Sequence, residues 1–383
     1  METDDAPPPV APGAPAVADP VAPPPPLRPP RARWHPIWWV LGTCLVLVAL
    51  LVGAAGVVRA PYVVFAPGSA FDTEEAISTP GTESYPSDGE VLFLTVSLRG
   101  ASRQIGYVEA AVGWLRGDYD VAPRKAIIGD QTGAENRQQS LQAMTGSQEV
   151  ASKVALEHLG YDVPTEGTGA QVLSVVRDAP VAEVLAPGDV IVGVDGEEID
   201  LDSQLRAALA DEAPGDEVAL AVQRGGEGDP VDVATELVAD PEDTERALLG
   251  VGVATRDLSY ELPFPVDIDT EDVGGPSAGL ALTLGILDHL TPGSLTGGID
   301  VATTGTMEPD GTVGEVGGVA QKAVAARAAG ATLMLVPEAE LDDATRLAPE
   351  DLRVVGVADL DDALAALAEV GGNALELDTS GGG

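Results

Sequence analysis

Residues Ile37 to Val58 form a stretch of 22 residues without a charged side chain. A helix of about 20 apolar residues is long enough to cross the hydrocarbon core of a bilayer. Trp34, Trp38 and Trp39 stand at its start, where aromatic side chains gather at membrane interfaces. We therefore expect a transmembrane helix at residues 37–58, with one short segment before it and one long segment after it.

Basic residues beside this stretch predict its orientation. Arg28, Arg31 and Arg33 precede it, whereas only Arg59 follows it closely. Because arginine-rich flanks stay in the cytoplasm, we expect a single-pass protein of the cell membrane, with a cytoplasmic N-terminus and extracytoplasmic C-terminal domains. The alternative is a cleaved signal peptide, which the length of the stretch and the poor cleavage site at residues 58–60 disfavour.

The two ends of the chain show no hydrophobic period. Residues 1–36 are rich in proline and alanine and predict a disordered cytoplasmic tail. Residues 371–383 end in three glycines and predict a second disordered tail. Some 325 residues follow the span, which suggests about two domains outside the membrane.

The composition excludes several kinds of chemistry. Cys44 is the only cysteine and lies inside the expected span, so a thiol nucleophile or a cysteine metal cluster is excluded outside the membrane. The three histidines are scattered without ligand spacing, so we predict no metal site and no cofactor. The net charge of −42 argues against nucleic acid, which binds through cationic contacts to phosphate. We interpret the charge as a solvated acidic surface.

The segment Gly274–Gly279 (GGPSAG) opens an apolar run that ends at Leu290. Proline suits the first position of a helix, so Ser277 is expected in the first turn, where free backbone N–H groups collect. Such donors can hold an oxyanion, and the candidate backbone positions are Gly275, Pro276, Ser277 and Ala278. The plain alternative is an ordinary glycine-rich helix start.

A serine nucleophile needs a base, and the chain offers few. The G-x-S-x-G pattern of α/β-hydrolases would require a downstream histidine, but His289 lies on the same helix, about 18 Å from Ser277. Lys322 stands one turn into the alanine-rich helix expected at residues 319–329, and the chain has only two other lysines. Its pKa must fall by about 2–3 for it to act near neutral pH. A solvent-facing lysine is the alternative.

From Asp267 to about Pro337 the sequence resembles the proteolytic domain of Lon proteases. The resemblance is carried by three motifs: Gly274–Gly279, the pair Thr304-Gly305, and the GG-x-x-x-K that ends at Lys322. The resemblance implies a catalytic dyad of Ser277 and Lys322, with Thr304 orienting the lysine. Many Lon enzymes have an acidic residue three positions before the serine, but here that position is Gly274. We therefore predict no acidic third member.

The ATPase of Lon has no counterpart in this sequence. None of the three lysines stands in the Gly-Lys-Ser/Thr pattern of a P-loop, so we predict cleavage without ATP. Lon proteolytic domains often form hexameric rings, so the resemblance is compatible with a homo-oligomer.

Residues 163–240 indicate a second, small β-rich module. The run from Pro187 to Gly196 (PGDVIVGVDG) places turn signals around a strand, and it resembles PDZ domains of bacterial proteases. Such domains bind peptide C-termini as an added strand. The resemblance implies a groove lined by loop 167–170, strand 172–176 and helix 201–209, with the residues Gly167, Gly169, Ala170, Val172, Leu173 and Val175. A spacer without a ligand is the alternative.

The expected fold class is an α/β (α+β) Lon-type proteolytic domain at residues 246–370, a small β-rich PDZ domain and one transmembrane helix. A strand at 89–96 and a helix at 142–159, within the extracytoplasmic segment 59–162, resemble the first part of the Lon fold. The PDZ module is then an insertion, with strands at 248–253 and 265–269 resuming the protease sheet. Residues 61–70 also resemble membrane-anchored Lon-like PDZ proteases of Gram-positive bacteria.

The combined hypothesis is a membrane-anchored, ATP-independent serine endopeptidase that acts on extracytoplasmic proteins, with protein or peptide substrates selected by the PDZ domain through their C-termini. The rival is a catalytically weak scaffold or binding protein at the cell surface whose active part is the PDZ domain. The sequence specifies neither the natural substrate and cleavage preference nor the oligomeric state.

Overall fold

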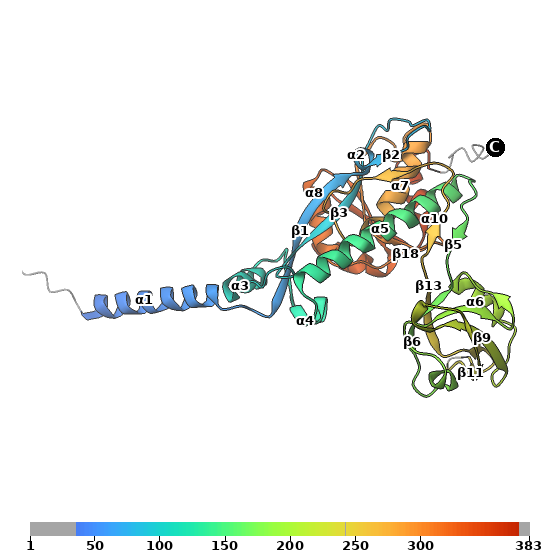
Figure 1. The fold of residues 1–383 in the computed structure, drawn as a ribbon. Coiled ribbons are helices and arrows are strands. Elements are labelled where there is room, and N and C mark those ends of the chain that lie inside the picture. The colour runs from blue at the N-terminus through green and yellow to red at the C-terminus, as the bar shows by residue number, and fades with distance from the viewer. Residues whose placement is uncertain (1–35, 242, 375–383) are drawn as a thin grey trace, which may run out of the picture. The chain divides into compact units, whose positions relative to one another are not determined.

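The computed structural model describes residues 36–241 and 243–374 (Figure 1). The sequence predicts disordered tails at residues 1–36 and 371–383, and most of each tail lies outside the described residues. Four residues of the second tail are described, and they are packed: Asn373 Nδ2 donates to the Pro292 carbonyl at 2.8 Å, and Ala374 is buried. The folded region therefore extends to Ala374, beyond the expected boundary at residue 370.

The chain divides into two units, residues 1–54 and 55–383. Helix α1 (Pro36–Val57) covers the expected span at residues 37–58 except for Val58. Among the described helices, it alone is long and apolar enough to cross a bilayer, and its window Ile37–Ala54 buries no surface within the protein. The helix meets this criterion by length and composition only.

Two segments far apart in sequence build one six-stranded mixed sheet. In spatial order the strands are β20 (Arg353–Val357), β19 (Leu333–Pro337), β16 (Val301–Thr303), β3 (Val91–Arg99), β1 (Tyr62–Asp72) and β4 (Asp120–Pro123). The parallel pairing of β3 with β16 joins the segment before the PDZ module to the segment after it.

Helices cover both faces of this sheet, which explains the continuous apolar run in β3. Val91 and Phe93 pack with α5 (Gly133–His158), α7 (Gly279–Leu290) and α10 (Leu360–Glu369). Leu92 and Leu94 pack on the other side with α8 (Val319–Ala328) and α9 (Leu341–Leu347). The expected buried helix after Ser277 is observed, because every residue of α7 from Gly279 to Asp288 is buried.

Short elements complete this region. They are α2 (Thr73–Ala76), β2 (Ile77–Ser78), α3 (Tyr107–Leu115), α4 (Arg124–Ile128), β15 (Asp267–Ile268), η3 (Pro276–Ala278), β17 (Thr306–Met307), β18 (Val313–Gly314) and η4 (Glu338–Glu340).

The PDZ module has its own sheet and its own apolar core. Its strands, in spatial order, are β10 (Val231–Glu236), β9 (Glu217–Gln223), β7 (Val190–Val194), β6 (Ala170–Val175) and β13 (Val251–Thr255). The remaining elements are η1 (Pro180–Glu183), β8 (Glu197–Glu198), α6 (Asp202–Ala208), η2 (Arg224–Gly226), β11 (Val238–Ala239) and β12 (Ala247–Leu248).

This pairing corrects one expectation. The sequence predicts that residues 248–253 resume the protease sheet, but β13 pairs with β6 inside the PDZ module. The protease segment resumes later, where β15 pairs with β2 as a separate two-stranded sheet. Between the two regions, β5 (Thr165–Glu166) pairs with β14 (Ser259–Tyr260), so the strands that enter and leave the module lie side by side.

Candidate active site

Ser277 lies in the turn η3 that leads directly into α7. Gly275 before it has φ 98° and ψ 151°, a conformation that essentially only glycine adopts. Its N–H donates to the Ser140 carbonyl of α5 at 2.7 Å, and Ser147 Oγ donates to the Pro276 carbonyl at 3.0 Å. Helix α5 therefore holds the loop on the N-terminal side of Ser277.

These contacts reduce the number of predicted backbone positions that can donate an N–H group to an oxyanion. The N–H of Gly275 is already bonded to Ser140, and Pro276 has no N–H to donate. Of the four positions, Ser277 and Ala278 remain the candidate donors. The missing N–H of Pro276 follows from the sequence alone, whereas the bond from Gly275 to Ser140 joins residues 135 positions apart and could not be foreseen.

Gly274 stands where many Lon enzymes have an acidic residue, and the structure shows why no side chain fits there. A Cβ at this position would lie 2.9 Å from Ser140 Cβ and 3.1 Å from the Ser140 carbonyl carbon. Asp272 lies nearby on the same loop, but its carboxylate is almost fully exposed and pairs with Arg137 at 2.8 Å. Asp272 also lines the cavity beside Ser277.

Lys322 lies one turn into α8 and is only 1% exposed. Its Nζ donates to Thr304 Oγ1 at 2.8 Å, and Thr304 Oγ1 donates to the backbone carbonyl of Ser277 at 3.1 Å. The three residues that the Lon resemblance selects are therefore connected in space. Among the described residues, no hydrogen bond joins Lys322 Nζ directly to Ser277 Oγ, and catalytic bonds are often long in a site without substrate.

Burial lowers the pKa of Lys322 to about 8, and the Glu340 carboxylate opposes this shift. Burial also raises the pKa of Glu340, whose carboxylate accepts a hydrogen bond from the Val316 N–H at 2.7 Å. A substantial fraction of neutral lysine is therefore present in the physiological pH range. The sequence analysis did not identify Glu340, because it lies in a short turn after β19 with no motif around it.

A cavity of about 250 Å³ opens beside Ser277. Most of its lining side chains are apolar: Phe71, Phe93, Leu94, Val96, Met144 and Val273. The rings of Phe71 and Phe93 stack with their centroids 5.1 Å apart. The cavity thus places an apolar wall next to the serine.

In the PDZ module, the structure does not support the groove expected on β6. Strand β6 pairs with β7 on one edge and with β13 on the other, so a peptide cannot add to it. Ala170 and Val172 are buried in the core of the module, and Gly169 packs against β7. Leu173 is exposed, yet its strand has no free edge for a peptide. The free edge beside α6 is β13.

A cavity of about 650 Å³ lies along this edge, between α6 and β13. Its apolar lining includes Leu205, Leu209, Val251 and Val253, and Arg206 and Arg246 also line it. The predicted groove helix, α6, thus lines this cavity. The predicted groove strand, β6, is wrong, because the strand that lines the cavity is its neighbour in the sheet, β13.

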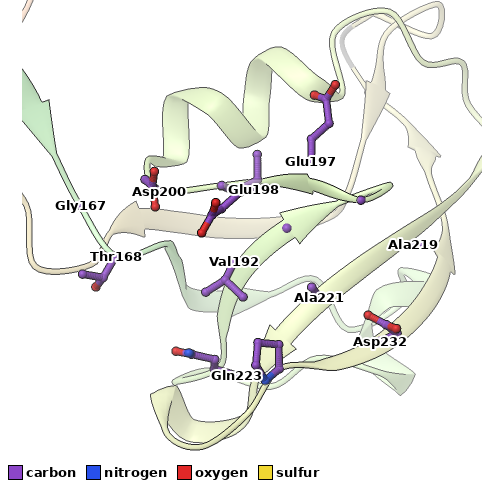
Figure 2. A pocket seen from close by; sticks show the side chains of 14 residues that line it. Gly167, Thr168, Val192, Glu197, Glu198, Asp200, Ala219, Ala221, Gln223 and Asp232 are labelled. Carbon is purple, nitrogen blue, oxygen red and sulfur yellow. The ribbon is translucent and has the colours of Figure 1, made fainter.

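A separate hollow of about 650 Å³ lies on the same module and is lined by Gly167, which the sequence assigned to the peptide groove (Figure 2). Its charged lining residues are Glu197, Glu198, Asp200 and Asp232. The described lining of this hollow includes no lysine, arginine or histidine, so it offers no basic side chain comparable to Lys322.

Comparison with known proteins also separates a proteolytic region from a PDZ module. The family model of the Lon protease (S16) C-terminal proteolytic domain matches residues 270–369, and the PDZ domain model matches residues 154–235. The Lon protease of Clostridioides difficile is 39% identical over 93 residues, which are 24% of this chain and 12% of that protein. The Lon protease of Methylocella silvestris is 34% identical over 139 residues, which are 36% of this chain and 15% of that protein.

Solved structures match the smaller module. The PDZ domain of the SdrC-like protein from Listeria monocytogenes is 27% identical, covering 22% of this chain and 87% of that one, with a TM-score of 0.20. A solution structure from Geobacillus thermodenitrificans has the same identity and TM-score and is covered to 95%.

Residues 270–369 thus match a Lon proteolytic domain, and residues 154–235 match a PDZ domain. The expected fold class, which combines these two domains, is confirmed. The matched stretches make up only 12% and 15% of the length of these two Lon relatives.

Proposed function

We propose that this chain is a membrane-anchored, ATP-independent serine endopeptidase with a Ser277–Lys322 dyad. The observation that carries the proposal is Lys322: its amine is buried, its pKa is lowered to about 8, and Thr304 links it to the Ser277 backbone. A buried amine that loses its proton near neutral pH can act as a general base. The match to a Lon proteolytic domain supports a peptide bond as the substrate.

In the proposed reaction, Ser277 Oγ attacks the carbonyl carbon of the scissile peptide bond while neutral Lys322 accepts the hydroxyl proton. The N–H groups of Ser277 and Ala278 stabilise the oxyanion of the tetrahedral intermediate. The intermediate collapses, the C–N bond breaks, and Lys322 returns its proton to the leaving amine. Water then attacks the acyl-enzyme while Lys322 accepts its proton. The C–O bond to Ser277 Oγ breaks and Lys322 returns the proton to Oγ, which releases the carboxylic acid and regenerates Ser277.

The two cavities supply the proposed substrate contacts. The apolar cavity beside Ser277 would bind an apolar side chain next to the scissile bond. The groove between β13 and α6 would bind a peptide C-terminus as an added strand, with Arg206 and Arg246 offering positive charge to its carboxylate. Both sites select among polypeptides, so neither requires an ATP-driven motor.

The uncharged helix α1 and the arginines before it support an anchor with a cytoplasmic N-terminus and extracytoplasmic catalysis. The observation against the rival scaffold function is again the buried lysine. Desolvation of the Lys322 amine costs stability, and its Nζ bonds to the Thr304 hydroxyl, whereas the buried amine of Lys153 is paired with the Glu157 carboxylate.

Ser277→Ala is the direct test of the proposed function. In the full chain, purified in detergent, it should reduce cleavage of an unfolded protein by about 10³-fold or more, because no other group supplies the nucleophile. Ser140→Ala is the matched control: it keeps the backbone carbonyl that holds Gly275 and should stay active. If Ser277→Ala cleaves like the wild type, the serine mechanism is wrong. If the wild type neither cleaves nor reacts with a fluorophosphonate probe, the scaffold function is favoured.

Amidation of the substrate C-terminus tests the PDZ groove. Loss of the carboxylate should raise KM by about 10- to 100-fold, the effect of one charge-assisted hydrogen bond. The value of kcat should not change, since this contact is equal in the ground state and the transition state. Equal KM values for free-acid and amidated substrates would show that the groove does not select C-termini.

A further inference from the structure

Large apolar side chains are exposed on the protease region, most of them on α3 (Tyr107–Leu115) and one, Ile127, on α4 (Arg124–Ile128). C-terminal to Arg59, ten large hydrophobic residues of the described chain are exposed, and six of them lie between residues 107 and 127. We call these six the α3 patch: Tyr107, Val108, Val112, Trp114, Leu115 and Ile127. Leu115 is 86% exposed, which makes a packing role within the chain impossible. Such a concentration marks an interaction surface.

The exposure follows from how α3 is fixed. Ala110 and Gly113 face inward, and a Cβ at Gly113 would lie 2.8 Å from Val121 Cγ2, so the helix packs closely against β1 and β4. Val108, Val112 and Leu115 follow at helical spacings of four and three and form the opposite, outer stripe. The apolar stripe is therefore presented by a well-packed helix.

Chain connectivity places the start of α3 close to the end of α1. Helix α1 ends at Val57. Three residues later, the Ala60 N–H donates to the Ile105 carbonyl at 2.8 Å, and Arg59 Nη1 donates to the Gln104 carbonyl at 3.1 Å. Three residues span at most about 11 Å, so Ala60 lies within that distance of the end of α1, and its hydrogen bond holds Ile105 beside it.

The local charge also differs from the rest of the chain. Between Arg99 and Ile127 five basic residues accompany three acidic ones, whereas the whole chain has 62 acidic residues against 20 basic. An anionic lipid surface would repel most of this acidic protein but not this region, where basic residues outnumber acidic ones. Tyr107 and Trp114 are the residue types that favour the membrane–water interface.

We propose that the α3 patch inserts into the interface of the same bilayer that α1 spans, and so provides a second membrane contact for the proteolytic domain. The inference rests on the proposed membrane anchor. The patch would lie in the headgroup region, where amphipathic helices bury their apolar face by about 5–10 Å.

The experiment uses the full chain with Cys44→Ala, reconstituted into vesicles of phosphatidylcholine and phosphatidylglycerol. A single Leu115→Cys residue carries an environment-sensitive fluorophore, and spin-labelled lipids act as quenchers. The emission should shift to shorter wavelength, and a quencher at headgroup depth should reduce it more than one at the bilayer centre. Val231→Cys, half-exposed on β10 of the PDZ module, is the control and should show neither effect.

Val108→Glu with Val112→Glu, added to the labelled chain, should abolish the shift and the quenching at position 115. If the labelled chain floats with vesicles but the fluorophore reports water, the patch does not bind lipid, and the anchor stands. If emission instead depends on the number of copies per vesicle, the patch is an interface between copies, and the proposal is wrong. A chain that does not float with vesicles would overturn both the anchor and the patch.

Discussion

Replacing Lys322 by methionine should abolish peptide-bond cleavage and stabilise the fold. Without the amine no group accepts the Ser277 proton, so the rate should fall by about 10³-fold or more. Because the amine is buried and its pKa is lowered to about 8, its removal should raise the free energy of unfolding at pH 7 by about 1–3 kcal/mol. Cleavage assays and denaturant unfolding of the same preparation measure both effects.

Lys153→Met is the matched control for this substitution. Lys153 is also buried, but its Nζ bonds to Glu157 and to the Pro309 carbonyl, away from Ser277. This variant should keep its activity and lose stability. A Lys322→Met chain that cleaves at a near wild-type rate would contradict the dyad.

The same lysine predicts a pH dependence with a defined sign. Only the neutral amine is a base, so kcat/KM should rise about tenfold per pH unit up to about pH 8 and then level off. The unfolded chain binds one more proton than the folded chain between about pH 8 and the ordinary lysine pKa of 10.5. The contribution of Lys322 to stability should therefore become less unfavourable as the pH rises through this window. A profile that is flat from pH 6 to 9 would contradict Lys322 as the base.

Thr304→Val should reduce kcat by about 10²-fold, the usual effect of a displaced catalytic group. The substitution keeps the shape of the side chain but removes the acceptor for Lys322 and the donor to the Ser277 carbonyl. The neighbouring Thr303→Val is the control, because Thr303 is equally buried and its hydroxyl has no partner in the described structure. That variant should be as active as the wild type and at least as stable.

A positioning role for Thr304 has its own signature. Thr304→Ser restores a hydroxyl and should recover much of the lost kcat, and KM should change little in either variant. If Thr303→Val and Thr304→Val lose the same activity, the effect is one of packing, and Thr304 does not orient the lysine.

Local sequence patterns predicted the elements that carry the candidate site but not all of their contacts. The proline of GGPSAG starts a turn, and the apolar run after it forms the buried helix α7, because both follow from short-range rules. The bond from Gly275 to Ser140 and the charge of Glu340 near Lys322 depend on residues brought together by the sheet. No pattern within a single segment encodes such contacts.

The peptide groove shows the same limit in the PDZ module. The strand at 172–176 was predicted correctly as a strand, but its place in the middle of the sheet was not. That place is set by β13, which comes about 80 residues later and covers the edge that the prediction left open. Sequence patterns identify strands from their own residues, whereas the order of strands in a sheet depends on pairing across long distances.

The pairing of β3 with β16 has a consequence for how the enzyme matures during synthesis. Strand β3 ends at Arg99, and its parallel partner begins at Val301, so the central sheet cannot close until about 200 further residues have been made. The PDZ module has its own core and can fold in the meantime, whereas contacts so distant in sequence form slowly. Ser277 and Lys322 both lie beyond this module and meet only when the late strands join the early ones. Under the proposed dyad mechanism, the nascent chain is therefore expected to be inactive until the completed polypeptide has folded.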